Sequence, residues 1–182
     1  MISAKKIAYT ALFAALCCIV TYVLPIPMPH GYFNFGDVFV LLSGWLLGSV
    51  WGGVAAGVGS ALADLLAGYA DYALITFFVK FTMAIVAYYG YVLLKKVIQK
   101  PALDFLPRFA AALVAELIMA FGYFAYECFA YGIGGGLAAL PANLLQGGCC
   151  LALGVALIVV LSQIPLIKKQ FPDLHEKDKK KE

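Results

Sequence analysis

The sequence predicts an all-α integral membrane protein with six transmembrane helices and with both termini in the cytoplasm. Three observations support this fold class: 64% of the residues are hydrophobic and only 13% are charged, long apolar runs fill the chain, and the mean hydropathy is +0.92, far above the soluble range. A transmembrane helix needs roughly 20 apolar residues. A chain of 182 residues with short connections therefore holds about six, in a single membrane domain 1–182.

The expected spans follow the apolar runs, and Pro-rich, Gly-rich or charged stretches divide them. They lie near residues 4–24, 37–51, 53–68, 72–94, 109–130 and 138–164, with dividers at 25–29, 52–53, 68, 95–108 and 132–136. The second and third spans are short, because about 15 residues rise only about 22 Å. We expect them to be thinly inserted, broken, or longer than these bounds. Residues 165–182 form a basic cytoplasmic tail.

The basic residues predict the orientation. A cytoplasmic N-terminus places every Lys and Arg except Lys80 on that side, that is Lys5, Lys6, Lys95, Lys96, Lys100, Arg108, Lys168, Lys169, Lys177, Lys179, Lys180 and Lys181. Lys and Arg in short loops favour the cytoplasm, so the loops 25–36, 69–71 and 131–137 should face outward. The first span runs into a Pro-rich loop with no small-residue cleavage site, which argues against a cleaved signal peptide.

The cysteines and histidines predict no metal site, cofactor or catalytic centre. Cys17, Cys18, Cys128, Cys149 and Cys150 all fall inside apolar runs, and no C-x-x-C spacing has a histidine partner. The two histidines, His30 and His175, lie in a loop and in the tail. We interpret the cysteines as small packing residues.

Small residues recur at helical spacing in two places, and such faces mark helix contacts in lipid. The first stripe consists of Gly44, Gly48, Gly52, Ala56 and Ser60. Internal packing is the favoured interpretation of that stripe. The second stripe, in the first span, consists of Ala4, Ala8, Ala11 and Ala15. It is either an internal seam or a flat face that docks a separate membrane protein.

Ionisable residues inside the spans carry the functional argument, because a charge at the bilayer centre costs from about 3 to more than 10 kcal/mol. Asp37, Asp64, Lys80, Glu116 and Glu127 occupy such positions. Asp64 and Lys80 are expected at similar depth. They form either a structural ion pair, or a site in which Lys80 anchors an anionic or carbonyl group of a ligand.

The last two spans place polar side chains on shared helix faces near the outer side. Glu116, Tyr123 and Glu127 are spaced by seven and four residues, and Asn143 and Gln146 by three. These faces are candidates for a binding site. For Glu127 the alternative to such a role is simple solvation at the membrane boundary. For Asn143 and Gln146 the alternative is hydrogen bonding between helices.

The outward loop 30–37 is aromatic and polar and has glycines near both ends. It contains Tyr32, and its Asn34 lies between two phenylalanines. This composition suits a lid over a pocket that stacks a flat ring and bonds its edges. An interfacial aromatic belt is the competing interpretation.

These segments resemble the substrate-binding S components of energy-coupling factor (ECF) transporters, which import vitamins in prokaryotes. The resemblance covers essentially the whole chain. It rests on the chain length, the expected spans, and the segments Ala-Leu-Phe-Ala-Ala at 11–15, Phe-Asn-Phe-Gly-Asp-Val at 33–38, the run from Gly57 to Leu66, and Phe-Phe-Val-Lys at 77–80. The nearest branch is similar to riboflavin-, hydroxymethylpyrimidine- and pyridoxine-type S components.

The resemblance implies a helical bundle that binds its substrate near the outer face. The implied ligand contacts are Tyr32, Asn34, Lys80, Tyr123, Glu127, Asn143 and Gln146. Ala11 and Ala15 are the implied docking residues for a transmembrane coupling subunit. Two cytoplasmic ABC-type ATPases complete such transporters, and this chain has no phosphate-binding G-x-x-x-x-G-K-[ST] loop. It is therefore expected to be a non-enzymatic subunit in the prokaryotic plasma membrane, without a nucleic-acid partner.

The residues of the expected pocket suit a small planar heterocycle with hydroxymethyl or amine groups. Pyridoxine (vitamin B6) or a hydroxymethylpyrimidine fits this description, and the larger riboflavin fits it less well. One alternative is a stand-alone homodimeric transporter that couples uptake to ions through its buried acids, with dependence on Glu116. An intramembrane enzyme is disfavoured, because such an enzyme needs a nucleophile beside a base and both histidines lie outside the spans.

Overall fold

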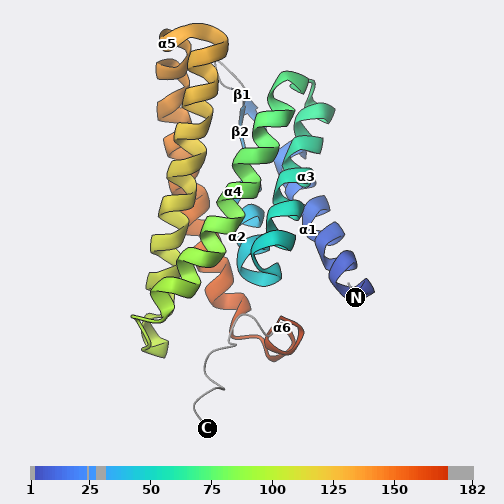
Figure 1. The fold of residues 1–182 in the computed structure, drawn as a ribbon, viewed down its shortest axis with the longest axis vertical. Coiled ribbons are helices and arrows are strands. Elements are labelled where there is room, and N and C mark those ends of the chain that lie inside the picture. The colour runs from blue at the N-terminus through green and yellow to red at the C-terminus, as the bar shows by residue number, and fades with distance from the viewer. Residues whose placement is uncertain (1–2, 24, 28–31, 172–182) are drawn as a thin grey trace.

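The computed structural model describes residues 3–23, 25–27 and 32–171. His30 of the expected lid, His175 and the tail lysines from Lys177 onward lie outside these ranges. The elements are α1 (Ala4–Val23), β1 (Ile26–Pro27), β2 (Tyr32–Phe33), α2 (Gly36–Leu47), α3 (Ser49–Ala67), α4 (Ala70–Lys95), a 3-10 turn η1 (Pro101–Leu103), α5 (Phe105–Leu161) and α6 (Pro165–Gln170). They form a helical bundle with one small antiparallel β-hairpin (Figure 1).

By length and composition, α1, α3, α4 and α5 can each cross a membrane. The helix α5 has 57 residues, which would extend about 86 Å if it were straight, nearly three times the hydrocarbon core of roughly 30 Å. Instead Gly132 takes a non-helical conformation with φ 79° and ψ 169°, and the chain turns back on itself there (Figure 1). The two arms of α5 thus occupy the fifth and sixth expected spans, and the turn is one glycine rather than a loop over 132–136.

The helix α2 is apolar but has only 12 residues, and it lies in the middle of the bundle. It contacts α1, α3, α4 and α5, and Phe39 is its only residue that is not fully buried. A helix that is hydrophobic all round belongs in a protein interior. This short second span therefore packs against protein rather than against lipid, and the count of six lipid-crossing helices stays a prediction.

The boundary that we predicted at Gly52 and Gly53 is wrong, because both residues lie inside α3. The break falls at Gly48, which has φ 83°, a conformation that glycine adopts without strain. A Cβ at position 52 would lie 2.5 Å from the Ser43 carbonyl oxygen. The glycine there allows α3 to fold back closely against α2.

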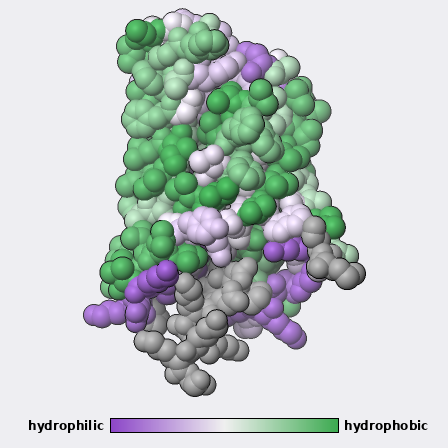
Figure 2. Space-filling model, viewed as in Figure 1, coloured by the Kyte–Doolittle hydropathy of each residue, from purple (hydrophilic) through white to green (hydrophobic). Residues whose placement is uncertain are grey.

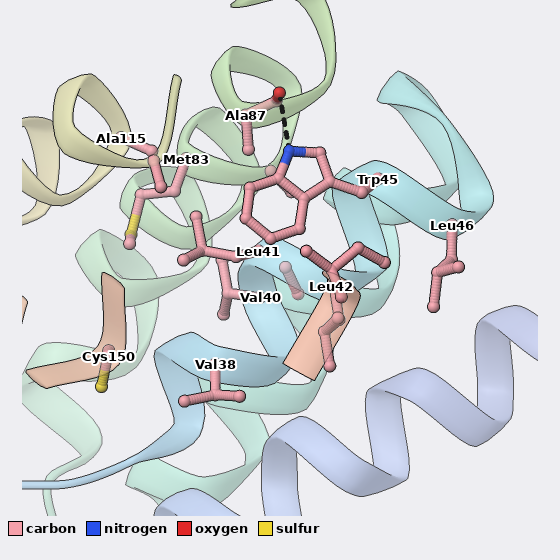
Figure 3. Packing of buried hydrophobic residues seen from close by; sticks show 14 of the residues in the cluster. Val38, Val40, Leu41, Leu42, Trp45, Leu46, Met83, Ala87, Ala115 and Cys150 are labelled. Carbon is pink, nitrogen blue, oxygen red and sulfur yellow. Dashed lines mark hydrogen bonds between the residues drawn. The ribbon is translucent and has the colours of Figure 1, made fainter. Parts of the chain in front are cut away.

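Close packing of the helices confirms the internal role of the Gly44–Ser60 stripe. A Cβ on Gly44 would lie 2.4 Å from the Ala84 carbonyl oxygen of α4, so only a glycine permits this approach. Near this contact the Trp45 indole donates a hydrogen bond of 3.0 Å to the Ala87 carbonyl (Figure 3). Leu41, Leu42 and Met83 pack around the indole and anchor α2 to α4 (Figure 3).

The alanine stripe of α1 is not an internal seam. The buried face of α1 carries Thr10, Phe13, Cys17 and Thr21, and this face packs on α3, where Gly59 approaches the backbone of residue 14. The stripe residues are exposed, namely Ala4, Ala8, Ala11 and Ala15. The stripe is therefore an exposed face of the bundle.

The two ends of the bundle differ in charge. The N-terminus, the α4–α5 connection and α6 lie at one end, here called the basic end, and the β-hairpin and the Gly132 bend lie at the other, the hairpin end (Figure 1). Lys5 and Lys6 begin α1, Lys95 ends α4, and Lys168 and Lys169 lie in α6. Figure 2 shows hydrophilic residues gathered at the basic end below a broad apolar band. This arrangement agrees with the basic-loop pattern from which we predict a cytoplasmic basic end.

Arg108, expected in a charged connection, is instead fully buried in the first turn of α5. Its Nε donates to Asp104 Oδ2 at 3.1 Å, and its guanidinium lies 4.0 Å from the centre of the Tyr91 ring. Asp104 also pairs with Lys95. Burial alone would raise the pKa of the Asp104 carboxyl, but Lys95 and Arg108 outweigh it and lower the pKa.

Candidate functional site

A pocket opens at the hairpin end, where β2, α3, α4 and both arms of α5 converge. Its lining consists of Tyr32, Asn34, Asp64, Tyr69, Tyr72, Thr76, Tyr123, Glu127, Asn143 and Gln146. The pocket leaves about 40 Å³ for the centres of water-sized molecules. One ordered water needs roughly 10–15 Å³ on this measure. Only a few waters fit, so a vitamin-sized ligand requires the walls to move apart.

The hairpin and the segment after it are fastened across the pocket by two hydrogen bonds, and a third holds the local turn of the segment. The Tyr32 hydroxyl donates to Asp64 Oδ1 at 2.7 Å, and the Asn34 backbone N–H donates to Gln146 Oε1 at 2.9 Å. The Asn34 side-chain oxygen accepts from the Gly36 N–H at 2.9 Å, at the start of α2. Burial, together with the neighbouring Asp64 carboxylate, raises the pKa of the Tyr32 phenol. The segment thus closes the pocket and links α3 to the second arm of α5.

Beneath the pocket lies a buried ion pair between α2 and α4. Lys80 Nζ is 2.5 Å from Asp37 Oδ1, and Gln146 Nε2 donates to Asp37 Oδ2 at 2.7 Å. The exposed fractions are 0% for Asp37 and 3% for Lys80. The expected Asp64–Lys80 pair is therefore wrong. The central position of α2 brings Asp37 to Lys80, whereas Asp64 bonds Tyr32.

This pairing also changes the expected position of Lys80. Among the described residues, Lys80 does not line the pocket, and its ammonium lies 5.2 Å from the centre of the Tyr123 ring. The other implied ligand contacts all line the pocket, namely Tyr32, Asn34, Tyr123, Glu127, Asn143 and Gln146. Lys80 therefore supports the pocket wall from below.

Two of the packing alternatives are now decided. Glu127 is only 2% exposed, so it is not solvated at the membrane boundary. Gln146 forms hydrogen bonds to α2 and to the segment after the hairpin. It therefore links these elements and is also part of the pocket wall. Glu116 lies on the first arm of α5, as Glu127 does. It is buried but does not line the pocket, and a Cβ on Gly147 of the second arm would lie 3.4 Å from its Oε2.

Sequence reasoning missed Tyr69, Tyr72 and Thr76 on the pocket wall. Tyr72, Thr76 and Lys80 are spaced by four residues, which puts them on one face of α4, and this spacing was a usable signal. The Thr76 and Tyr123 hydroxyls lie 3.0 Å apart. The Tyr69 ring centre is 5.1 Å from that of Tyr32. An aromatic wall of tyrosines therefore surrounds the polar groups.

Four polar atoms of this wall are buried and have no hydrogen-bond partner among the described residues. They are Asp64 Oδ2, Tyr72 OH, Glu127 Oε2 and Asn143 Nδ2. Tyr72 and Asn143 are close enough to Glu127 to act on its carboxyl, yet no well-formed hydrogen bond joins these atoms. Buried polar groups are nearly always bonded, and each unmade bond costs about 1–3 kcal/mol. Such a cluster is typical of a site that completes its hydrogen bonds with a ligand.

Comparisons with known proteins show the family and the fold of this chain. A family model described as "ECF-type riboflavin transporter, S component" matches residues 1–163. A Pyrococcus woesei protein, "Uncharacterized protein in gap 3'region", is 31% identical over 140 residues, which cover 77% of this chain and 88% of the relative. A solved structure, "Structure and mechanism of the S component of a bacterial ECF transporter", matches with a TM-score of 0.64 and 19% identity over 87% of this chain and 96% of its own, a likeness in fold. The chain belongs to the ECF-type riboflavin transporter S component family.

Proposed function

We propose that this multi-pass S component captures a small planar heterocycle, of the pyridoxine or hydroxymethylpyrimidine type, in the pocket at its hairpin end. The observation that carries the proposal is the set of four buried, unpartnered polar atoms inside a wall of tyrosines. Tyrosine faces stack flat rings, and the carboxylates, amides and hydroxyls bond groups at the ring edge. The captured vitamin would then be delivered across a prokaryotic plasma membrane.

Riboflavin is the second candidate, because the matching family model names it. It carries three fused rings and a polyol chain, whereas the pocket leaves about 40 Å³ for the centres of water-sized molecules. The smaller cargo requires less movement of the walls, and we favour it for that reason.

ECF S components work with a membrane coupling subunit and two ATPases, and we propose the same assembly for this chain. Ala11 and Ala15 lie on the exposed alanine stripe of α1, whose small side chains would let a partner helix approach closely. Ala11→Trp should abolish ATP-driven uptake in the assembled transporter and leave ligand affinity unchanged, because the stripe residues do not line the pocket. The neighbouring exposed Leu12→Trp serves as the control for a bulky residue outside the stripe. Loss of ligand affinity in Ala11→Trp would contradict the docking role.

A thermal-shift and titration screen of the purified chain tests the cargo. The ligands are pyridoxine, pyridoxamine, hydroxymethylpyrimidine, thiamin and riboflavin. A ligand at 100 times its Kd stabilises the fold by about 2.7 kcal/mol, so one tight binder among the small heterocycles is the expected result. Binding of riboflavin alone would establish the second candidate. Silence across the panel would overturn the proposal and favour the ion-coupled homodimer, which takes up solute without any ATPase.

A matched pair of variants ties binding to the pocket. Tyr72→Phe removes a hydroxyl of the pocket wall and should weaken binding by about tenfold, the value of one hydrogen bond of roughly 1.4 kcal/mol. Tyr22→Phe removes a hydroxyl from an exposed tyrosine of α1 and should leave binding unchanged. Equal affinities of the two variants would place the site elsewhere.

A further inference from the structure

The charged groups of the pocket wall are all acids. Asp64 and Glu127 line the pocket, and no Lys, Arg or His does so among the described residues. The two acids are 5% and 2% exposed, and each has one carboxylate oxygen without a hydrogen-bond partner in the described part of the chain. The pocket therefore holds two buried carboxyl groups with no basic side chain on its described wall to pair with them.

The nearby basic residue does not supply the missing charge. Lys80 lies below the wall, 2.5 Å from Asp37, and the two opposite charges largely cancel. Asp71, at the start of α4, adds another acid at the same end of the bundle, and it is exposed and bonded to the Tyr131 hydroxyl at 3.1 Å. Glu116 is a further buried acid close to the ion pair. The described surroundings of the pocket thus contain more acidic than basic groups.

The tyrosines of the wall suit a cation as well. Tyr32, Tyr69, Tyr72 and Tyr123 line the pocket. Their ring centres are linked in a chain, at 5.1 Å for Tyr32 and Tyr69, 6.3 Å for Tyr69 and Tyr72, and 6.4 Å for Tyr72 and Tyr123. Aromatic faces attract a cation, and the attraction is stronger when water is excluded. Carboxylates inside such an aromatic cage form a recognition site for an ammonium or a cationic ring.

We infer that the pocket selects a positively charged form of its cargo, with a protonated amine held between Asp64 and Glu127. The inference rests on the proposed function and names the charge of its substrate class. A buried carboxylate without a counter-charge is costly. A neutral hydroxymethyl group can donate a hydrogen bond to the carboxylate but does not neutralise the carboxylate charge. An ammonium group does both, because its hydrogen bond to the carboxylate is charge-assisted.

The test compares two ligands that share one ring and differ only in this group. Pyridoxamine carries an aminomethyl group where pyridoxine carries a hydroxymethyl group, and both are titrated calorimetrically into the purified chain at neutral pH. Pyridoxamine should bind at least about tenfold more tightly. Equal binding of the two, or tighter binding of pyridoxine, would overturn charge selection and leave heterocycle capture intact. Failure of both to bind would overturn the inference, and the proposed function would fall with it only if hydroxymethylpyrimidine also failed to bind.

Isosteric variants assign the preference to the two acids. Glu127→Gln and Asp64→Asn keep the shape and an acceptor oxygen, including one for the Tyr32 hydroxyl, but remove the charge. Each should reduce the preference for pyridoxamine over pyridoxine by about tenfold. Asp71→Asn is the control, because Asp71 is an acid at the same end that does not line the pocket. An unchanged preference in the Glu127 and Asp64 variants, with thermal unfolding showing them folded, would overturn the inference.

Discussion

Loss of Lys80 should destabilise the bundle, because it leaves the Asp37 carboxylate buried without its cation. Lys80 Nζ lies 2.5 Å from Asp37 Oδ1, and neither side chain is more than 4% exposed. Removing one partner of a buried ion pair costs about 3–5 kcal/mol. Gln146 still donates to the other Asp37 oxygen, so we expect Lys80→Met to cost about 3 kcal/mol. For a chain of this size, this lowers the Tm by about 6–12 °C, at about 2–4 °C per kcal/mol.

A double variant identifies the partner. Asp37→Asn combined with Lys80→Met removes both charges and should recover most of the lost stability, because replacing both members of a buried pair is often nearly neutral. Asp64→Asn combined with Lys80→Met is the matched control and should recover none. The measurement is thermal unfolding of each variant in detergent. Recovery through Asp64→Asn instead, or an unchanged Tm in Lys80→Met alone, would refute the assignment of the pair.

Two further perturbations test the packing and the basic end. Gly44→Val places a Cβ 2.4 Å from the Ala84 carbonyl oxygen and should lower the Tm by several degrees. The control is Gly134→Ala, whose Cβ would meet nothing within 4 Å and which should not lower the Tm. Equal effects of the two variants would contradict the close α2–α4 contact. Asp104→Asn removes the acid that pairs with Lys95 and should lower the Tm at neutral pH. The folded pKa of Asp104 lies below its ordinary 3.8. Its stabilisation is therefore present above pH 3.8 and is lost as the pH falls through the lowered value. The Tm difference between the variant and the native chain should shrink in that acidic range, and a constant difference would exclude the ionic origin.

Local patterns in the sequence predict much of the pocket. Tyr123 and Glu127 were placed on one helix face by their spacing, Asn143 and Gln146 on another, and the structure brings both faces to one cavity. Gly68 was correctly expected between two helices, and it ends α3 with φ 85°. These predictions depend on helical periodicity and on glycine chemistry, which act over a few residues.

Contacts between distant helices were not predictable in the same way. Lys80 and Asp37 are 43 positions apart, and several acids lie at a depth that would suit one lysine. The sequence also did not decide whether the alanine stripe of α1 is buried or exposed, because alanine fits an internal seam and a flat surface alike. The break at Gly48 rather than at Gly52 depends on how closely α3 folds back on Ser43.

The sequence alone is enough to establish a helical membrane protein whose basic residues gather at one end and whose polar groups gather at the other. Hydrophobic runs and basic connections determine these features locally. Only the tertiary structure decides that α2 lies at the centre, that Asp37 neutralises Lys80, and that Asp64 and Glu127 line the pocket without a described cation on its wall. The physical reason is that helix packing sets which charges meet, and packing depends on the shapes of all the helices together.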